Sequence, residues 1–297
     1  MHRRYLYAVI DPALACNLRC SMCFFSNPES LKKMGGRFSE DDIESIAIAV
    51  FHRVLKLQIG CGAEPTTYKN LNRLVSIAAE HGIHNISLTT NGNLLSFDSL
   101  KQLVDSGLSE IILSAHGMSK VTYEEMMRGA SFERFKQRIA NLSVMKEKHP
   151  ELRVRINYTM CDDNVDDLVY IPSVFSALKP DVIQLRPVQD VGSTAYSNYS
   201  VSSLVQKYET CVKPVISFCN EHHITCLYPE PENLVVIDEE NVSGQHLNSV
   251  VDMLPYFHLS PHEGWKDEFD PYHETFESLS RRNHRVRNML GLLFGLN

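Results

Sequence analysis

Three cysteines near the start of the chain are the residues best suited to chemistry. Cys16, Cys20 and Cys23 stand at C-x3-C-x2-C spacing, directly after a predicted first strand. Cysteine thiolates hold iron–sulfur clusters, and a [4Fe–4S] cluster normally takes four of them. Three thiolates would leave one iron open to a molecule from solution, which makes an electron-carrying cluster into a reaction site. The spacing therefore indicates a cluster with one open iron.

Three other interpretations of these cysteines stay open. They could pack in the core with no ligand role. They could bind zinc, but zinc sites usually close with a fourth Cys or His, and no second C-x2–4-C pair follows. They could include a lipidation site, because Arg3 and Arg4 precede an apolar run that ends at Cys16. A signal peptide needs an unbroken apolar core, however, and Asp11 and Pro12 interrupt this one.

The motif resembles the cluster motif of the radical S-adenosylmethionine (SAM) superfamily. Cys16, Cys20 and Cys23 stand where its cluster ligands stand, and Met22 fills its bulky apolar position before the third cysteine. The resemblance implies one [4Fe–4S] cluster, with SAM bound to the open iron. It also implies that the protein reductively cleaves SAM to methionine and a 5′-deoxyadenosyl radical, which removes hydrogen from a substrate.

Two further segments resemble SAM-binding motifs of this family. The run 60–65 is similar to its G-G-E-P segment, so Gly62 would let the backbone approach SAM. Glu64 would accept hydrogen bonds from the SAM ammonium, and Ala63 replaces the usual second glycine. The next predicted strand ends in Thr-Thr-Asn-Gly, where the resemblance directs Thr90 toward SAM, although turn chemistry alone also explains Asn-Gly.

The remaining candidate residues follow the later strands. Ser114 matches the family's S-x-D-G pattern and would contact the SAM ribose or carboxylate, and His116 replaces the Asp. A neutral imidazole donates or accepts and titrates near neutral pH, so His116 is a candidate catalytic residue that faces the substrate; a structural role is the alternative. Asn157 and Arg186 match polar positions that touch SAM in relatives, and arginine suits a bidentate grip on carboxylate.

These positions need a scaffold that brings strand ends together, and the hydrophobic pattern predicts one. Six strands alternate with helices, which implies an α/β fold with parallel strands and right-handed crossovers. The predicted strands are 5–10, 55–59, 86–90, 110–114, 153–159 and 182–185. The predicted helices are one capped by Ser39, 71–81, one capped by Ser96, one over 132–145, 166–177 and 204–219. Six units do not complete an eight-stranded barrel, and they resemble the open (β/α)6 partial barrel of the radical SAM core.

The chain divides in this interpretation into a core domain, residues 1–228, and a C-terminal extension, residues 229–297, that caps the barrel mouth. The extension shows weak periodicity until a predicted helix over 276–293. Its segments around 226–238 and 276–287 faintly resemble a SPASM module, which binds auxiliary clusters. No cysteine follows Cys226, so we expect no auxiliary cluster, and the extension is either a degenerate module or ends before the remaining ligands.

Composition limits the partners and the compartment. The chain has 297 residues, of which 43% are hydrophobic, and carries a formal charge of −7, which argues against nonspecific binding to nucleic acid. No apolar run approaches the ~20 residues of a membrane span. The eight cysteines are too scattered for a disulfide framework, which favours a reducing, cytoplasmic compartment. Four of those outside the motif are expected to pack as small apolar residues: Cys61, Cys161, Cys211 and Cys219.

The family resemblance implies a substrate and an electron donor. The substrate would be a small molecule or a peptide, since peptide, sugar and nucleotide substrates share this core. The electron would come from a protein such as flavodoxin or ferredoxin. The alternative function is a non-catalytic protein that binds SAM or the cluster on the same scaffold. Its support is the altered Ala63 and His116 and the missing auxiliary cysteines.

Overall fold

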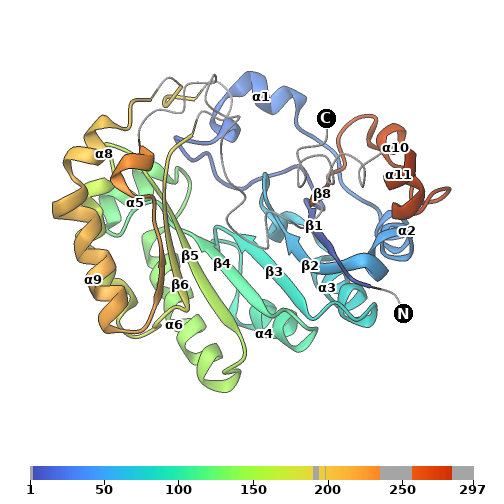
Figure 1. Cartoon of the computed structure of the whole chain (residues 1–297), viewed down its shortest axis with the longest axis horizontal. Helices are drawn as coiled ribbons and strands as arrows, with labels where there is room; N and C mark the ends of the chain where they lie inside the picture. Colours follow the sequence, from blue (N-terminus) through green and yellow to red (C-terminus); the bar gives the residue numbers. More distant parts are fainter. Residues whose placement is uncertain (1–2, 190–193, 198, 235–255, 283–297) are drawn as a thin grey trace.

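The computed structural model describes residues 3–189, 194–197, 199–234 and 256–282. These residues form one parallel sheet in the order β7-β6-β5-β4-β3-β2-β1-β8, which curves without closing (Figure 1). The strands are β1 Leu6–Ile10, β2 Val54–Ile59, β3 Asn85–Thr90, β4 Glu110–Ser114, β5 Arg153–Met160, β6 Val182–Pro187, β7 Thr225–Leu227 and β8 Tyr256–Leu259. The prediction of an α/β partial barrel is confirmed, and β7 and β8 extend the six predicted strands at the two edges.

The helices are α1 Pro28–Lys33, α2 Glu40–Val50, α3 Leu71–Glu80, α4 Phe97–Asp105, α5 Lys120–Met126, α6 Phe132–Lys148, α7 Ile171–Phe175, α8 Ser202–Gln206, α9 Lys213–Glu221, α10 Trp265–Glu268 and α11 Phe276–Arg282. Helices α2, α3, α4, α6 and α9 lie on the outer side of the curved sheet, whereas α1 stands at the top of the view (Figure 1). Ser39 and Ser96 form capping boxes at the starts of α2 and α4, as predicted. Gly82 and Gly107 follow α3 and α4 with φ of 75° and 111°, values that glycine adopts without strain.

Two predicted helices are interrupted, and proline is the reason at both places. Residues Val165–Tyr170 form a 3-10 helix, and α7 then begins with Pro172 in its first turn. The second prediction, 204–219, separates into α8, a π-helical turn over Tyr208–Val212 and α9, whose first turn holds Pro214. Proline lacks an N–H donor, so it fits a first turn and breaks a helix interior.

The barrel interior is unusually polar for a core. Glu110 at the start of β4 is almost fully buried, and it lies 3.2 Å from Lys56 of β2 and 3.4 Å from Arg155 of β5. A buried carboxylate is tolerated because both cations neutralise it. The residues that point outward from the same strands, such as Leu57 and Ile111, pack in the apolar core against the helices.

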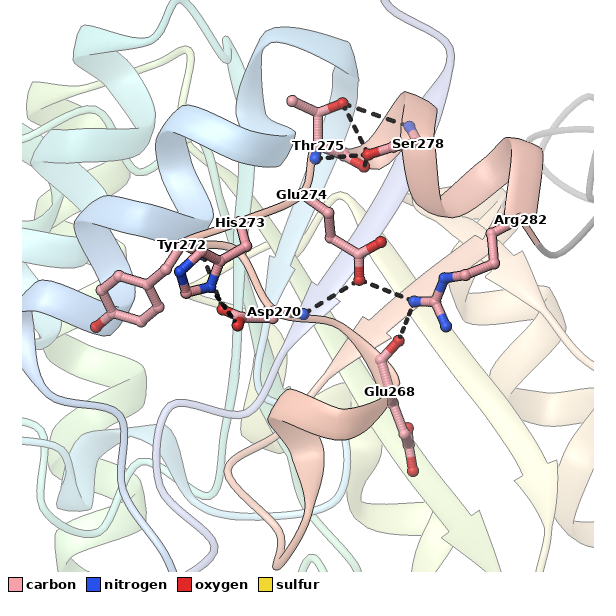
Figure 2. A network of polar contacts seen from close by, with 8 residues as sticks. All are labelled: Glu268, Asp270, Tyr272, His273, Glu274, Thr275, Ser278 and Arg282. Atoms are coloured by element: carbon pink, nitrogen blue, oxygen red, sulfur yellow. Dashed lines mark hydrogen bonds and ion pairs between the residues drawn. The ribbon is translucent and has the colours of Figure 1, made fainter.

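The described part of the extension packs beside β1 and α2. Strand β8 pairs in parallel with β1, and Trp265 of α10 packs edge-on against Phe38 at 4.8 Å. A polar network within the extension joins α10, α11 and the turn between them (Figure 2). The predicted helix over 276–293 is seen as α11, and its later residues lie outside the described part. The domain boundary at 228 and the capping of the barrel mouth stay predictions.

Within the same described ranges, no helix has the length and apolar character that crossing a membrane requires.

Candidate functional site

A cavity of about 300 Å³ opens at the carboxyl ends of the strands, where parallel α/β folds gather their chemistry. Nine of the ten predicted site residues line it: Cys16, Cys20, Cys23, Gly62, Glu64, Thr90, Ser114, His116 and Arg186. The tenth, Asn157, does not line the cavity but pairs in register with Ser114 on β4 and Gln184 on β6. Separate segments of the sequence therefore converge on one site.

Backbone contacts from the end of α5 hold the cysteine loop. The amide of Arg19 donates to the carbonyl of Arg128 at 2.9 Å, and the amide of Ser21 donates to that of Met126 at 2.9 Å. Asn91 on the β3 side donates to the Asn17 side chain at 3.0 Å. These contacts fix a loop that has little regular structure of its own.

The three thiols are half-buried, and the chemistry of this donor set fits a cluster. Burial raises the pKa of the Cys16 thiol to about 11, and burial together with the neighbouring thiols raises the pKa of Cys20 further. Among the described residues, no three Cys, His, Asp or Glu side chains converge closely enough for a single metal ion. In a four-iron cluster each thiolate binds a different iron, so the three thiols need to line one cavity but need not converge on a single atom.

The loop after β2, residues 60–65, is shaped by a buried carboxylate that the sequence analysis missed. Asp11, only 1% exposed, accepts hydrogen bonds from the amides of Cys61 at 2.9 Å, Gly62 at 3.1 Å and Ala63 at 3.3 Å. Gly60 has φ of 87°, and a Cβ there would lie 2.6 Å from the Thr89 carbonyl oxygen. Ala63 therefore fits the loop, whereas Gly60 must be glycine.

Glu64 joins the ends of two strands. Its carboxylate, 3% exposed, accepts from the Thr90 hydroxyl at 2.6 Å and from the amide of Asn91 at 2.8 Å. It also accepts from the hydroxyl and the amide of Thr66. Burial raises the pKa of Glu64, while these donors favour its charged form. Thr90 thus contacts Glu64 directly, and both side chains are fixed in direction.

His116 is buried and neutral, which corrects the expectation that it titrates near neutral pH. Burial and the nearby Arg186 guanidinium lower the pKa of His116 from 6.5 to about 3. Its Nδ1 accepts from the amide of Thr159 at 3.2 Å, so the proton of the neutral ring lies on Nε2. His116 is therefore a hydrogen-bond donor at the cavity wall over the ordinary pH range.

Several polar groups that line the cavity, or pair with a strand residue that lines it, have unused hydrogen-bonding capacity. Among the described residues, the buried Asn157 Oδ1 and Thr89 Oγ1 atoms have no hydrogen-bond partner. Arg186 donates from Nε to the Thr159 hydroxyl at 3.3 Å. An unpaired acceptor, a hydroxyl and a guanidinium are the groups that a ribose and an amino-acid carboxylate would satisfy. The residues present therefore fit SAM as well as the cluster.

The structure adds site residues that sequence reasoning missed. Phe25, Met127 and Val188 give the cavity an apolar side, and Thr159 contacts both His116 and Arg186 as described above. The sequence could have indicated Asp11 as a site residue, because it directly follows the first strand at the carboxyl edge of the sheet. Cys61 is exposed and lines the cavity, so the expectation that it packs in the core is wrong.

Comparisons with known proteins show which sequences this chain resembles. The family model described as the radical SAM superfamily matches residues 10–168. PqqA peptide cyclase from Rhodopseudomonas palustris is 29% identical over 212 residues, which cover 71% of this chain and 54% of that protein. GTP 3′,8-cyclase from Peptoclostridium acidaminophilum is 26% identical over 197 residues, which cover 66% of this chain and 59% of that protein. The chain thus spans little more than half the length of these curated relatives.

A solved structure has the same fold. Streptococcus suis SuiB bound to S-adenosylmethionine superposes with a TM-score of 0.64 at 18% sequence identity, and the match covers 87% of this chain and 59% of that one.

Proposed function

The chain belongs to the radical SAM superfamily, and from this premise we propose that it is an enzyme that cleaves SAM at one [4Fe–4S] cluster. The observation that carries the proposal is the single cavity that joins Cys16, Cys20 and Cys23 to Glu64 and Arg186. When bound, the cluster and SAM supply a 5′-deoxyadenosyl radical that removes hydrogen from a substrate.

The polar residues of the cavity bind and orient SAM in this proposal. Glu64 accepts from the SAM ammonium, and its existing bonds to Thr90 and Asn91 keep its oxygens in place. Arg186 grips the carboxylate, and Ser114 and Asn157 hydrogen-bond the ribose or carboxylate. Fixing a ligand this way lowers the entropy lost when the reacting atoms meet.

Two other features act on the substrate side of the site. His116 donates from Nε2 to substrate or SAM and transfers no proton, since its ring stays neutral. The apolar side chains Met22, Phe25 and Val188 exclude water from the space beside the cysteines. The extension, residues 229–297, is proposed to cover the mouth of the core domain, residues 1–228.

The partners follow from the family and from the names of the relatives. Those names describe cyclases of a peptide and of GTP, which supports a peptide or a small molecule as substrate here. An electron donor such as flavodoxin or ferredoxin would reduce the cluster.

All eight cysteines are free thiols, which supports a reducing, cytoplasmic compartment. The non-catalytic alternative loses support from Ala63, because its amide reaches Asp11 as its neighbours do.

The test is reconstitution with iron and sulfide without oxygen, followed by SAM and dithionite. The wild type should bind about four irons with the Mössbauer signature of a cubane cluster and release 5′-deoxyadenosine. Cys20→Ala should lose the cluster and the product. Cys211→Ala, which changes a buried cysteine beside α9, is the matched control and should keep both. A complete cluster that yields no 5′-deoxyadenosine, even with candidate substrates, would contradict the proposal.

A further inference from the structure

One histidine of the extension contacts Asp11, the buried carboxylate that accepts from the loop after β2, residues 60–65. His258 lies on β8, and its Nε2 is 2.9 Å from Asp11 Oδ2. The Asp11 side chain is 1% exposed, whereas the imidazole is 38% exposed. The two residues are 247 positions apart in sequence. The contact therefore links the C-terminal extension to the core at the edge of the cavity.

His258 is the side-chain donor among the described hydrogen-bond partners of Asp11. The Oδ1 and Oδ2 atoms of Asp11 accept from the three amides of the loop over 61–63, and the imidazole supplies the additional side-chain donor. A buried carboxylate that loses a donor keeps its full desolvation cost, so the surrounding structure shifts to recover a partner. The loop amides are the groups free to shift, because they belong to a connection rather than to a strand.

The pairing of β8 with β1 holds His258 in place. Strand β8 pairs with β1 in the register Val9↔His258 and Ile10↔Leu259, and the amide of Asp11 donates to the Leu259 carbonyl at 2.9 Å. Phe257 and Leu259 point into the core, so His258 and Tyr256 share the opposite, more exposed face. Tyr256 on this face also lies close enough to Cys61 to affect the pKa of its thiol, so β8 and the loop meet at a second place.

The outer part of the extension anchors this strand. Arg282 of α11 binds Glu274 at 2.8 Å and the Glu268 carbonyl at 2.9 Å, which ties α10 to α11 (Figure 2). Glu277 of α11 pairs with His52 and Arg53 of the core. Phe257 of β8 packs against Phe276 of α11, with ring centroids 5.4 Å apart, so these contacts help to hold β8 beside β1.

We propose that Asp11 and His258 are positioning residues for SAM, so that the extension contributes to the cofactor site without touching the cofactor. His258 fixes the Asp11 carboxylate, and Asp11 in turn orients the amides of residues 61–63 beside Glu64. The inference rests on the proposed function in one respect, namely that SAM binds against this loop. It adds that SAM affinity depends on a strand far along the chain.

The experiment compares His258→Phe with His258→Gln, which retains a donor, and with His262→Phe. His262 is the matched control, because it is 40% exposed and lies 3.0 Å from Glu268 on the same extension. Amide hydrogen exchange of the cluster-free protein should show faster exchange over residues 61–63 in His258→Phe only. In the reconstituted protein, the Kd for SAM should rise about tenfold in His258→Phe, as expected for one lost bond to a charged group. His258→Gln should recover most of the affinity.

The outcomes separate the inference from the proposed function. Wild-type exchange and wild-type SAM affinity in His258→Phe would overturn the inference. Faster exchange with unchanged SAM affinity would overturn it too, because the pair would then be structural only. A rise in KM for SAM with kcat retained at saturation supports positioning. If the wild type itself binds no SAM, the proposed function fails whatever the exchange data show. Should His258→Phe disturb packing, His258→Ala tests the same contact.

Discussion

The buried imidazole of His116 should make the folded protein less stable as the pH falls. In the unfolded chain a histidine has a pKa near 6.5, and in the folded state burial and Arg186 lower the pKa of His116 to about 3. Between these values the unfolded chain binds a proton that the folded chain does not. The free energy of unfolding therefore decreases as the pH drops, and the single site accounts for about 2 kcal/mol between about pH 7.5 and about pH 5.

The assay is urea denaturation of the cluster-free protein under reducing conditions at both pH values. Because other groups also titrate, the quantity of interest is the difference between wild type and His116→Gln, which keeps an acceptor for the Thr159 amide but cannot ionise. That difference should change by about 2 kcal/mol between the two pH values. His116→Asn should give the same change, although its absolute stability differs. A difference that is independent of pH would refute the claim that the ring is held neutral.

Two further expectations concern the groups that shape the site. Glu64→Gln should lower the free energy of unfolding by about 2 kcal/mol in urea denaturation. The glutamine side chain has one acceptor oxygen, whereas the carboxylate accepts from the Thr90 hydroxyl on one oxygen and from the Asn91 amide on the other. An unchanged value would mean that these bonds are not formed in solution. Gly117→Ala should cost about 3 kcal/mol, since the added Cβ would lie 2.4 Å from the Tyr123 amide nitrogen. Gly35→Ala is the matched control, with nothing within 4 Å of the new Cβ, and equal stability of the two variants would contradict the packing argument.

Much of the fold could be predicted because its signals are local. Ser39 and Ser96 cap their helices through residues three positions later, which the sequence displays directly. Gly82 and Gly107 end helices because the backbone there needs a positive φ. Strand β5 shows an alternation of polar and apolar residues over 153–157, as expected for a strand with one face in the apolar core and the other in the polar interior.

The missed elements have weak local signals. Strands β7 and β8 span only three and four residues, Thr225–Leu227 and Tyr256–Leu259. Each is a strand because it pairs with a neighbour, β7 with β6 and β8 with β1. The interrupted helices have apolar residues at helical spacing on both sides of a proline. Periodicity alone cannot reveal that the helix restarts at Pro172 or Pro214 rather than continuing.

The candidate site was predictable in so far as it lies on strand ends. Because parallel strands end at one edge, residues that follow successive strands meet there, and nine of ten did. Asp11 and His258 differ, because their contact depends on β8 adding to β1 across most of the chain. No pattern in either segment signals the other.

The imidazole at position 116 also changes the charge of the cavity. An Asp there, as in the family pattern, would offer Arg186 a carboxylate partner. His116 is neutral, so it does not neutralise the positive charge of Arg186. Within the described ranges Arg186 has no carboxylate partner. The guanidinium therefore keeps its charge for an anionic group, at a site where burial already lowers its pKa by disfavouring the charged form. In the proposed function that group is the SAM carboxylate, so the departure from the family pattern at His116 strengthens the anion-binding side of the site.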